Sequence, residues 1–107
     1  METNGSKIIM VSGVCCDPSL ARVEKDLERR IRETVLELGL SAEVNIVSLG
    51  SVLSGDAPVS QEQLTLLQAL FQKYGSRMAP TGLVGKRVLF AGGAPDSVKL
   101  TRLLESL

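Results

Sequence analysis

Apolar residues recur along the chain with two spacings, and each spacing predicts a type of secondary structure. Residues 7–11 form an almost uninterrupted apolar run, which is typical of a buried strand. Farther along, apolar residues return at every third or fourth position and form one stripe: Leu20, Val23, Leu27, Ile31, Val35 and Leu38. Asp17 suits the N-cap of a helix, Pro18 its first position and Gly39 its C-terminal stop. The first part of the chain therefore predicts a strand followed by a helix over residues 18–38.

A second strand, a loop and a second helix follow. Val44 and Ile46 alternate with polar neighbours, which is typical of a strand. Residues 50–58 are rich in Gly, Ser, Asp and Pro, and they predict a loop. Ser60 and Gln63 fit a capping box at the start of a helix, and Gly75 suits its end. The apolar stripe of this helix comprises Leu67, Leu70, Phe71 and Tyr74.

The end of the chain predicts a hairpin and a last helix. Residues 81–84 and 87–91 have the composition of short strands, and Gly85-Lys86 between them suits a tight turn. Asp96 then suits the cap of a helix. The apolar residues of this helix are Leu100, Leu103, Leu104 and Leu107.

This order of elements, βαβ followed by αββα, predicts an α/β fold. A crossover helix between the first two strands makes them parallel, and the hairpin adds antiparallel strands. We therefore expect a four-stranded mixed sheet with three helices. The chain has 107 residues, which is enough for one core, so we expect a single domain over residues 1–107 with a flexible N-terminus over residues 1–6.

Composition and charge exclude several classes of function. Twelve basic residues balance twelve acidic ones, and aromatic residues make up only 3%, so the chain has neither the field nor the stacking surface of a nucleic-acid-binding protein. The basic residues Arg29, Arg30 and Arg32 alternate with glutamates, which predicts a solvated helix face. We expect no membrane-spanning segment, because no apolar run approaches ~20 residues. Since nothing in the sequence resembles a signal peptide, we expect a cytoplasmic protein.

The chemistry of this sequence centres on Cys15 and Cys16, which are its only cysteines. They lie between the first predicted strand and the first predicted helix, and a helix N-terminus stabilises a thiolate. Cys16 is nearer the helix, so we expect the lower thiol pKa there, although the charge of Asp17 opposes this effect. In the reducing cytosol, adjacent cysteines favour a metal-binding or reactive pair over a structural disulfide. The chain contains no histidine, which excludes imidazole ligands and Cys-His dyads.

The predicted order of elements, with thiols after the first strand and Ala79-Pro80-Thr81 before the hairpin, resembles the thioredoxin superfamily. The resemblance covers nearly the whole chain and implies a thioredoxin-like fold. It also implies that Pro80 is a cis proline and that its loop faces the thiols.

Within that superfamily, Cys15-Cys16 and the turn Ala91-Gly92-Gly93-Ala94-Pro95 are most similar to the arsenic-resistance metallochaperone and trans-acting repressor family. That resemblance implies that Cys15 and Cys16 are metalloid ligands. The third cysteine of that family has no counterpart here. A third ligand would therefore come from a partner chain, as in a homodimer, from a small thiol, or from the thioether of Met10 or Met78. For Met78, core packing is the favoured interpretation.

A weaker resemblance connects the segment Cys16-Asp17-Pro18-Ser19 with monothiol glutaredoxins. It implies that Cys16 is a nucleophile and that glutathione is a thiol substrate. The substrate-binding residues that it implies are Ala79, Pro80, Thr81, Gly92 and Gly93.

Three functions follow from these observations. The first is binding of a soft metal or metalloid ion by the vicinal cysteines, as a carrier or sensor, with no other cofactor required. The second is thiol–disulfide exchange with Cys16 as nucleophile, and only this function would make the protein an enzyme. The third is a thioredoxin-like interaction module without chemistry. Ion binding requires both cysteines, exchange requires Cys16, and the module requires neither.

Overall fold

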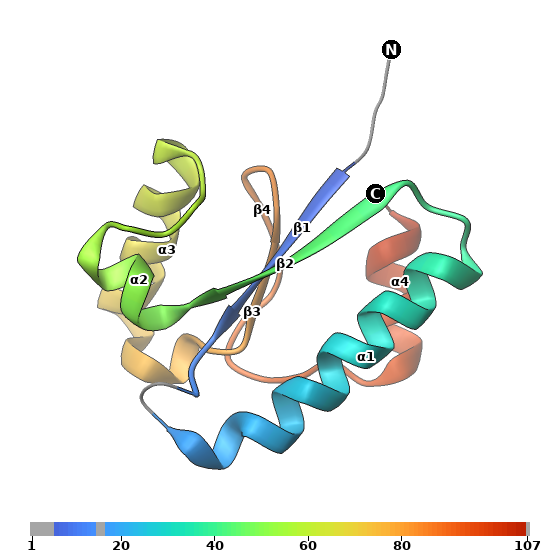
Figure 1. Ribbon diagram of the computed structural model, residues 1–107, viewed down its shortest axis with the longest axis horizontal. Coiled ribbons are helices and arrows are strands. Elements are labelled where there is room, and N and C mark those ends of the chain that lie inside the picture. Colours follow the sequence, from blue (N-terminus) through green and yellow to red (C-terminus); the bar gives the residue numbers. More distant parts are fainter. Residues whose placement is uncertain (1–5, 15–16, 107) are drawn as a thin grey trace.

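The computed structural model describes residues 6–14 and 17–106. Within these residues it contains four strands, four α-helices and two short 3-10 helices (Figure 1). In chain order they are β1 (Ser6–Ser12), η1 (Pro18–Leu20), α1 (Ala21–Glu37), β2 (Ala42–Ser48), α2 (Leu49–Ser54), α3 (Gln61–Tyr74), η2 (Gly75–Met78), β3 (Thr81–Val84), β4 (Arg87–Phe90) and α4 (Ser97–Glu105).

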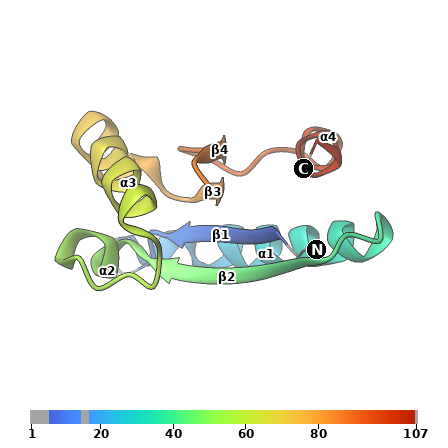
Figure 2. The same cartoon turned by 90° about the horizontal axis from the view of Figure 1, so that it is seen from above.

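The strands form one sheet in the order β2-β1-β3-β4, and Figure 2 shows them side by side. Strand β1 is parallel to β2 and antiparallel to β3, so that Val11 lies opposite Val47 on one side and Thr81 on the other. The β3–β4 hairpin turns at Gly85, whose φ of 58° is the left-handed conformation that such a turn requires. The predicted α/β class and four-stranded mixed sheet are confirmed.

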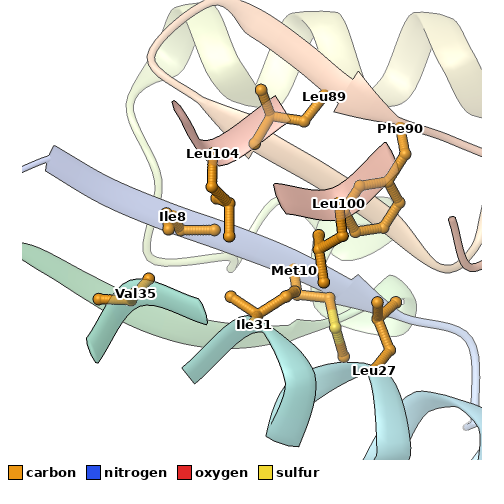
Figure 3. Close-up of a cluster of buried hydrophobic side chains, with 9 residues drawn as sticks. All are labelled: Ile8, Met10, Leu27, Ile31, Val35, Leu89, Phe90, Leu100 and Leu104. Atoms are coloured by element: carbon orange, nitrogen blue, oxygen red, sulfur yellow. The ribbon is translucent and has the colours of Figure 1, made fainter. Parts of the chain in front are cut away.

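Helices cover both faces of the sheet. Helices α1 and α4 lie on one face, and α2 and α3 lie on the other (Figure 1). Residues of β1 alternate between the two faces: Ile8 and Met10 pack toward α1 and α4, whereas Ile9 and Val11 pack toward α2 and α3. Figure 3 shows the first of these two clusters, in which α1, β1, β4 and α4 all contribute side chains. The centre of the sheet is therefore buried on both sides.

Several local predictions are confirmed by hydrogen bonds at the ends of helices. Ser60 and Gln63 form the expected capping box at the start of α3. The Asp96 carboxylate accepts a hydrogen bond from the Lys99 N–H and caps α4. On the outer face of α1, the predicted charged residues form ion pairs, such as Arg29–Glu33 and Arg32–Glu28. Local polar patterning thus sets these helix ends and this helix surface.

The prediction of three helices is wrong, because residues 49–54 form helix α2 instead of the start of a loop. The Ser48 hydroxyl oxygen accepts a hydrogen bond from the Ser51 N–H and caps the helix. Leu49 and Val52 lie on the same side of the helix and are both fully buried. Burial of this apolar pair outweighs the low helix propensity of Gly50 and the serines.

The boundaries and the buried stripe of the first helix also differ from the prediction. The segment predicted as one helix from residue 18 begins with the 3-10 helix η1, and α1 starts at Ala21. Val23 is 46% exposed, whereas Glu24 is only 4% exposed and begins the buried stripe that continues through Leu27. The stripe is thus rotated by one position at its start, and a carboxylate occupies a place where an apolar side chain was expected.

Two other predictions, one about burial and one about the start of the first strand, also differ from the structure. Tyr74 was predicted in the buried stripe of α3 but is 48% exposed. Ser6 was predicted in the flexible N-terminus but is the first residue of β1, whereas residues 1–5 lie outside the described part. Among the helices of residues 6–14 and 17–106, none combines the length and apolarity that a membrane span requires.

Candidate functional site

Cys15 and Cys16 lie outside the described residues, but the structure describes the chain on both sides of them. Strand β1 ends at Ser12, and Gly13 and Val14 lead toward the cysteines. On the far side, the Asp17 N–H donates a hydrogen bond of 2.8 Å to the Gly13 carbonyl. Gly13 and Asp17, the two ends of the segment that carries both cysteines (residues 13–17, the cysteine segment), are therefore joined directly.

Asp17 and Pro18 begin the 3-10 helix η1, which leads into α1. The exposed Asp17 carboxylate accepts hydrogen bonds from the Ser19 N–H and the Ser19 hydroxyl. Pro18 occupies the first position of η1, where its missing N–H leaves no donor unsatisfied. The structure thus assigns Asp17 a capping role at the start of η1.

Gly13 is the residue that attaches the cysteine segment to the rest of the fold. Its N–H donates a hydrogen bond of 2.8 Å to Oε2 of Glu24, within the protein interior. A Cβ at this position would lie 2.7 Å from the Cβ of Ala79 and 3.1 Å from Cδ1 of Leu20. Only glycine permits this approach, so the segment after β1 lies directly against the residue that precedes Pro80.

The three residues before and at the start of β3, Ala79, Pro80 and Thr81, differ in their contacts near Gly13. Ala79 is 5% exposed and contacts the position of Gly13, as described above. The Ala79–Pro80 peptide bond is cis, and Pro80 is buried. Thr81 is fully buried, and its hydroxyl donates a hydrogen bond to the Met78 carbonyl. Ala79 therefore lies against Gly13, whereas Pro80 and Thr81 are buried.

Gly92 joins the same region, but Gly93 does not. The Gly92 N–H donates a hydrogen bond of 2.7 Å to the Met78 carbonyl, which also accepts the Thr81 hydroxyl. This bond fixes the turn after β4 against the segment that leads to Pro80. Gly93 is exposed, and nothing lies within 4 Å of where its Cβ would be.

A pocket of about 270 Å³ connects these elements beside the cysteine segment. Its lining residues are Asp17, Leu20, Ser76, Arg77, Ala79 and Gly92. Two of the predicted substrate-binding residues, Ala79 and Gly92, thus lie around one hollow with the residue that follows Cys16. A larger pocket of about 630 Å³ runs along the charged outer face of α1 and includes none of these residues. We take the smaller pocket as the candidate site, because Asp17, which directly follows Cys16 in the chain, lines it.

A second small pocket, of about 240 Å³, lies on the Val14 side of the cysteine segment. Met10 and Glu24 are among its lining residues. Met10 is 2% exposed and also belongs to the core cluster on the α1 face, as Figure 3 shows. Met78 is fully buried in the cluster on the opposite face, which agrees with its interpretation as a packing residue.

Within residues 6–14 and 17–106, no three carboxylate or other ligating side chains come together as a metal site. The residue that the sequence pattern did not reveal is Glu24, because its neighbour Val23 was predicted in the buried stripe. Its spacing from Leu27 and Ile31 is the signal that would have placed it on the buried side.

Comparison of the chain with protein-family models, with curated proteins and with solved structures finds no match.

Proposed function

We propose that the chain is a small cytosolic thiol protein of thioredoxin-like fold that binds a soft metal or metalloid ion through Cys15 and Cys16, as a carrier or sensor. The observation that carries the proposal is the Asp17 N–H to Gly13 carbonyl hydrogen bond of 2.8 Å. It joins the two ends of the short segment that holds both cysteines. A short segment with fixed ends limits how far two thiolates can separate, which favours chelation of a single ion.

The thioredoxin-like assignment is supported by the order and direction of the strands. The sheet has the order β2-β1-β3-β4, and its first two strands are parallel and joined through α1. Helix α3 lies on the opposite face from α1 and α4 (Figure 1). This arrangement supports the resemblance on which the assignment rests, and it puts the cysteine segment at the end of the central strand β1.

Thiolates are soft ligands, and they select Cu(I), zinc and trivalent metalloids over hard cations. The chain supplies two thiolates and no imidazole. We propose that the remaining ligands come from a second copy of the chain or from a small thiol such as glutathione. Binding requires thiolates in place of thiols, so each ion bound would release protons.

Thiol–disulfide exchange is the second candidate, and the pocket beside Asp17 favours it. This pocket borders the cysteine segment and reaches Ala79 and Gly92. In this reaction the Cys16 thiolate attacks one sulfur of a substrate disulfide, forms a mixed disulfide and releases the other sulfur as a thiolate. Cys15 or an external thiol then attacks Cys16 and releases the reduced substrate.

Native mass spectrometry of the reduced protein, titrated with arsenite or with Zn(II), separates these functions. The measurement includes Cys15→Ser and Cys16→Ser, with free thiols counted in parallel. Ser19→Ala is the matched control, because it changes one exposed hydroxyl close to the cysteines and leaves both thiols intact. We expect the wild type and the control to bind the ion and both cysteine variants to lose it.

Other outcomes would reject ion binding. In one such outcome neither ion binds, Cys15→Ser still reacts rapidly with glutathione disulfide, and Cys16→Ser does not react. The protein is then a thiol–disulfide oxidoreductase. If both thiols are inert toward ions and disulfides, only an interaction module without chemistry remains.

A further inference from the structure

Glu24 is a buried charged residue that occupies an apolar position of helix α1. It is 4% exposed and precedes Leu27 and Ile31 on the stripe that packs against the sheet. A buried carboxylate has a large desolvation cost unless it is paired or hydrogen-bonded. A conflict of this kind between local pattern and residue type is typical of functional positions. Glu24 therefore needs an explanation beyond packing.

The contact of Glu24 supplies that explanation. Its Oε2 accepts a hydrogen bond of 2.8 Å from the Gly13 N–H, eleven residues earlier in the chain. The carbonyl of the same glycine accepts the Asp17 N–H at 2.8 Å. Both polar backbone groups of Gly13 are thus used, one toward Glu24 and one across the cysteine segment. Glu24 thus fixes Gly13 at one end of the cysteine segment, and the Gly13 carbonyl binds the N–H of Asp17 at the other end.

Close packing against Ala79 limits where Gly13 can lie while it donates its hydrogen bond to Glu24. The place where its Cβ would be is only 2.7 Å from the Cβ of Ala79. The hydrogen bond to Glu24 therefore holds Gly13 against the segment before Pro80 while the helix holds Glu24. Lys25 and Glu28, which line the same small pocket as Glu24, have no hydrogen bond to Gly13 among the contacts of the described residues.

We propose that Glu24 is a positioning residue for the cysteine pair: its carboxylate fixes Gly13, and through Gly13 it orders the chain that presents Cys15 and Cys16 to a soft ion. This inference rests on the proposed ion binding. Ordering the segment before binding removes part of the conformational entropy that chelation would otherwise cost. Freeing about one backbone residue would weaken ion binding about tenfold, which corresponds to about 1.4 kcal/mol.

Three variants test the proposal. Glu24→Leu removes the acceptor, Glu24→Gln keeps an acceptor oxygen without the charge, and Glu28→Gln removes a charge from the same pocket without touching Gly13. We expect Glu24→Leu to bind arsenite about tenfold more weakly and to exchange the Gly13 amide proton faster in the ion-free protein. Glu24→Gln and Glu28→Gln should stay within about threefold of the wild type in both measurements.

A backbone ester at Gly13 provides the complementary change, because it deletes the N–H donor to Glu24 and leaves every side chain in place. It can be introduced by joining a synthetic 1–14 thioester to residues 15–107 through Cys15. Since it leaves the side chain of Glu24 in place, it tests the same hydrogen bond if Glu24→Leu does not fold. We expect the ester protein to bind arsenite as weakly as Glu24→Leu.

The results distinguish this inference from the proposed function. If the wild type binds arsenite and the ester protein or folded Glu24→Leu binds it equally well, the positioning role is overturned. Equal losses in Glu24→Gln and Glu24→Leu would also overturn it, because charge and not the hydrogen bond would then matter. If the wild type binds no ion, the proposed function fails. The amide exchange of Gly13 then decides alone, and an unchanged rate in Glu24→Leu overturns the inference.

Discussion

Replacing Gly13 by alanine would put a methyl group 2.7 Å from the Cβ of Ala79 and 3.1 Å from Cδ1 of Leu20. Leu20 can rotate away, because the atom concerned is the end of a flexible side chain. The Cβ of Ala79 cannot, because it is fixed to the backbone that leads into β3. The new methyl must therefore push the segment after β1 away from the segment before Pro80.

The magnitude follows from this displacement. Carbon atoms pack at about 3.5–4.0 Å, so the two methyl carbons must separate by close to 1 Å. Overpacking of this kind costs about 1–3 kcal/mol in the free energy of unfolding. For a domain of about 100 residues, that loss lowers Tm by roughly 4–12 °C. The strain lies beside the cysteine segment, so we also expect weaker ion binding.

A double-mutant cycle with Ala79→Gly, measured by urea unfolding, isolates the contact. Ala79→Gly alone should cost about 1–2 kcal/mol, through the lost methyl and the freer backbone. It also removes the atom with which the new methyl collides. We therefore expect the double variant to be at least about 1 kcal/mol more stable than the sum of the single effects.

Gly93→Ala is the control for this cycle, because nothing lies within 4 Å of its Cβ position. We expect it to change the free energy of unfolding by no more than about 0.5 kcal/mol. Additive effects of Gly13→Ala and Ala79→Gly, within about 0.5 kcal/mol, would refute the close approach of the two segments.

Two further predictions concern the helices. The hydrogen bond and charge of Arg29 hold the pKa of Asp26 below its ordinary value. The stability that this carboxylate contributes is therefore present above its pKa in the unfolded chain and is lost as the pH falls through its pKa in the folded protein. Arg29→Gln should raise the pKa of Asp26 in a carboxyl NMR titration, and an unchanged pKa would contradict the pairing. Ser60→Ala removes one half of the capping box of α3 and should cost about 1 kcal/mol in urea unfolding, whereas a loss within error would show that the cap does not hold the helix.

Much of the fold could be predicted from the sequence, because local chemistry determines it. The Ser60 cap, the Gly85-Lys86 turn and the Asp96 cap each combine a residue type with a position that few other residues satisfy. Helix α2 could not be recognised in the same way. Its residues have low helix propensity, and it forms because Leu49 and Val52 find a place in the core, which depends on the whole fold.

The candidate site could be predicted only in part. The sequence predicted a site at the cysteines, and the resemblance predicted Ala79 and Gly92 as part of it. The structure places Ala79 and Gly92 around one pocket with Asp17. The sequence did not identify Glu24, because an acidic residue in a helix is normally exposed. The burial of Pro80 and Thr81 could not be predicted from the sequence either, because it depends on how η2 meets β3.

X-ray absorption at the zinc edge of the Zn(II)-loaded, reduced protein tests the central claim most directly. The account predicts at least two sulfur neighbours per ion at about 2.3 Å, the distance typical of zinc–thiolate bonds. It also predicts that Cys15→Ser and Cys16→Ser each lower the number of sulfur neighbours or abolish loading. An ion surrounded only by oxygen and nitrogen atoms, or a sulfur count that neither variant changes, would contradict the proposal that Cys15 and Cys16 bind the ion together.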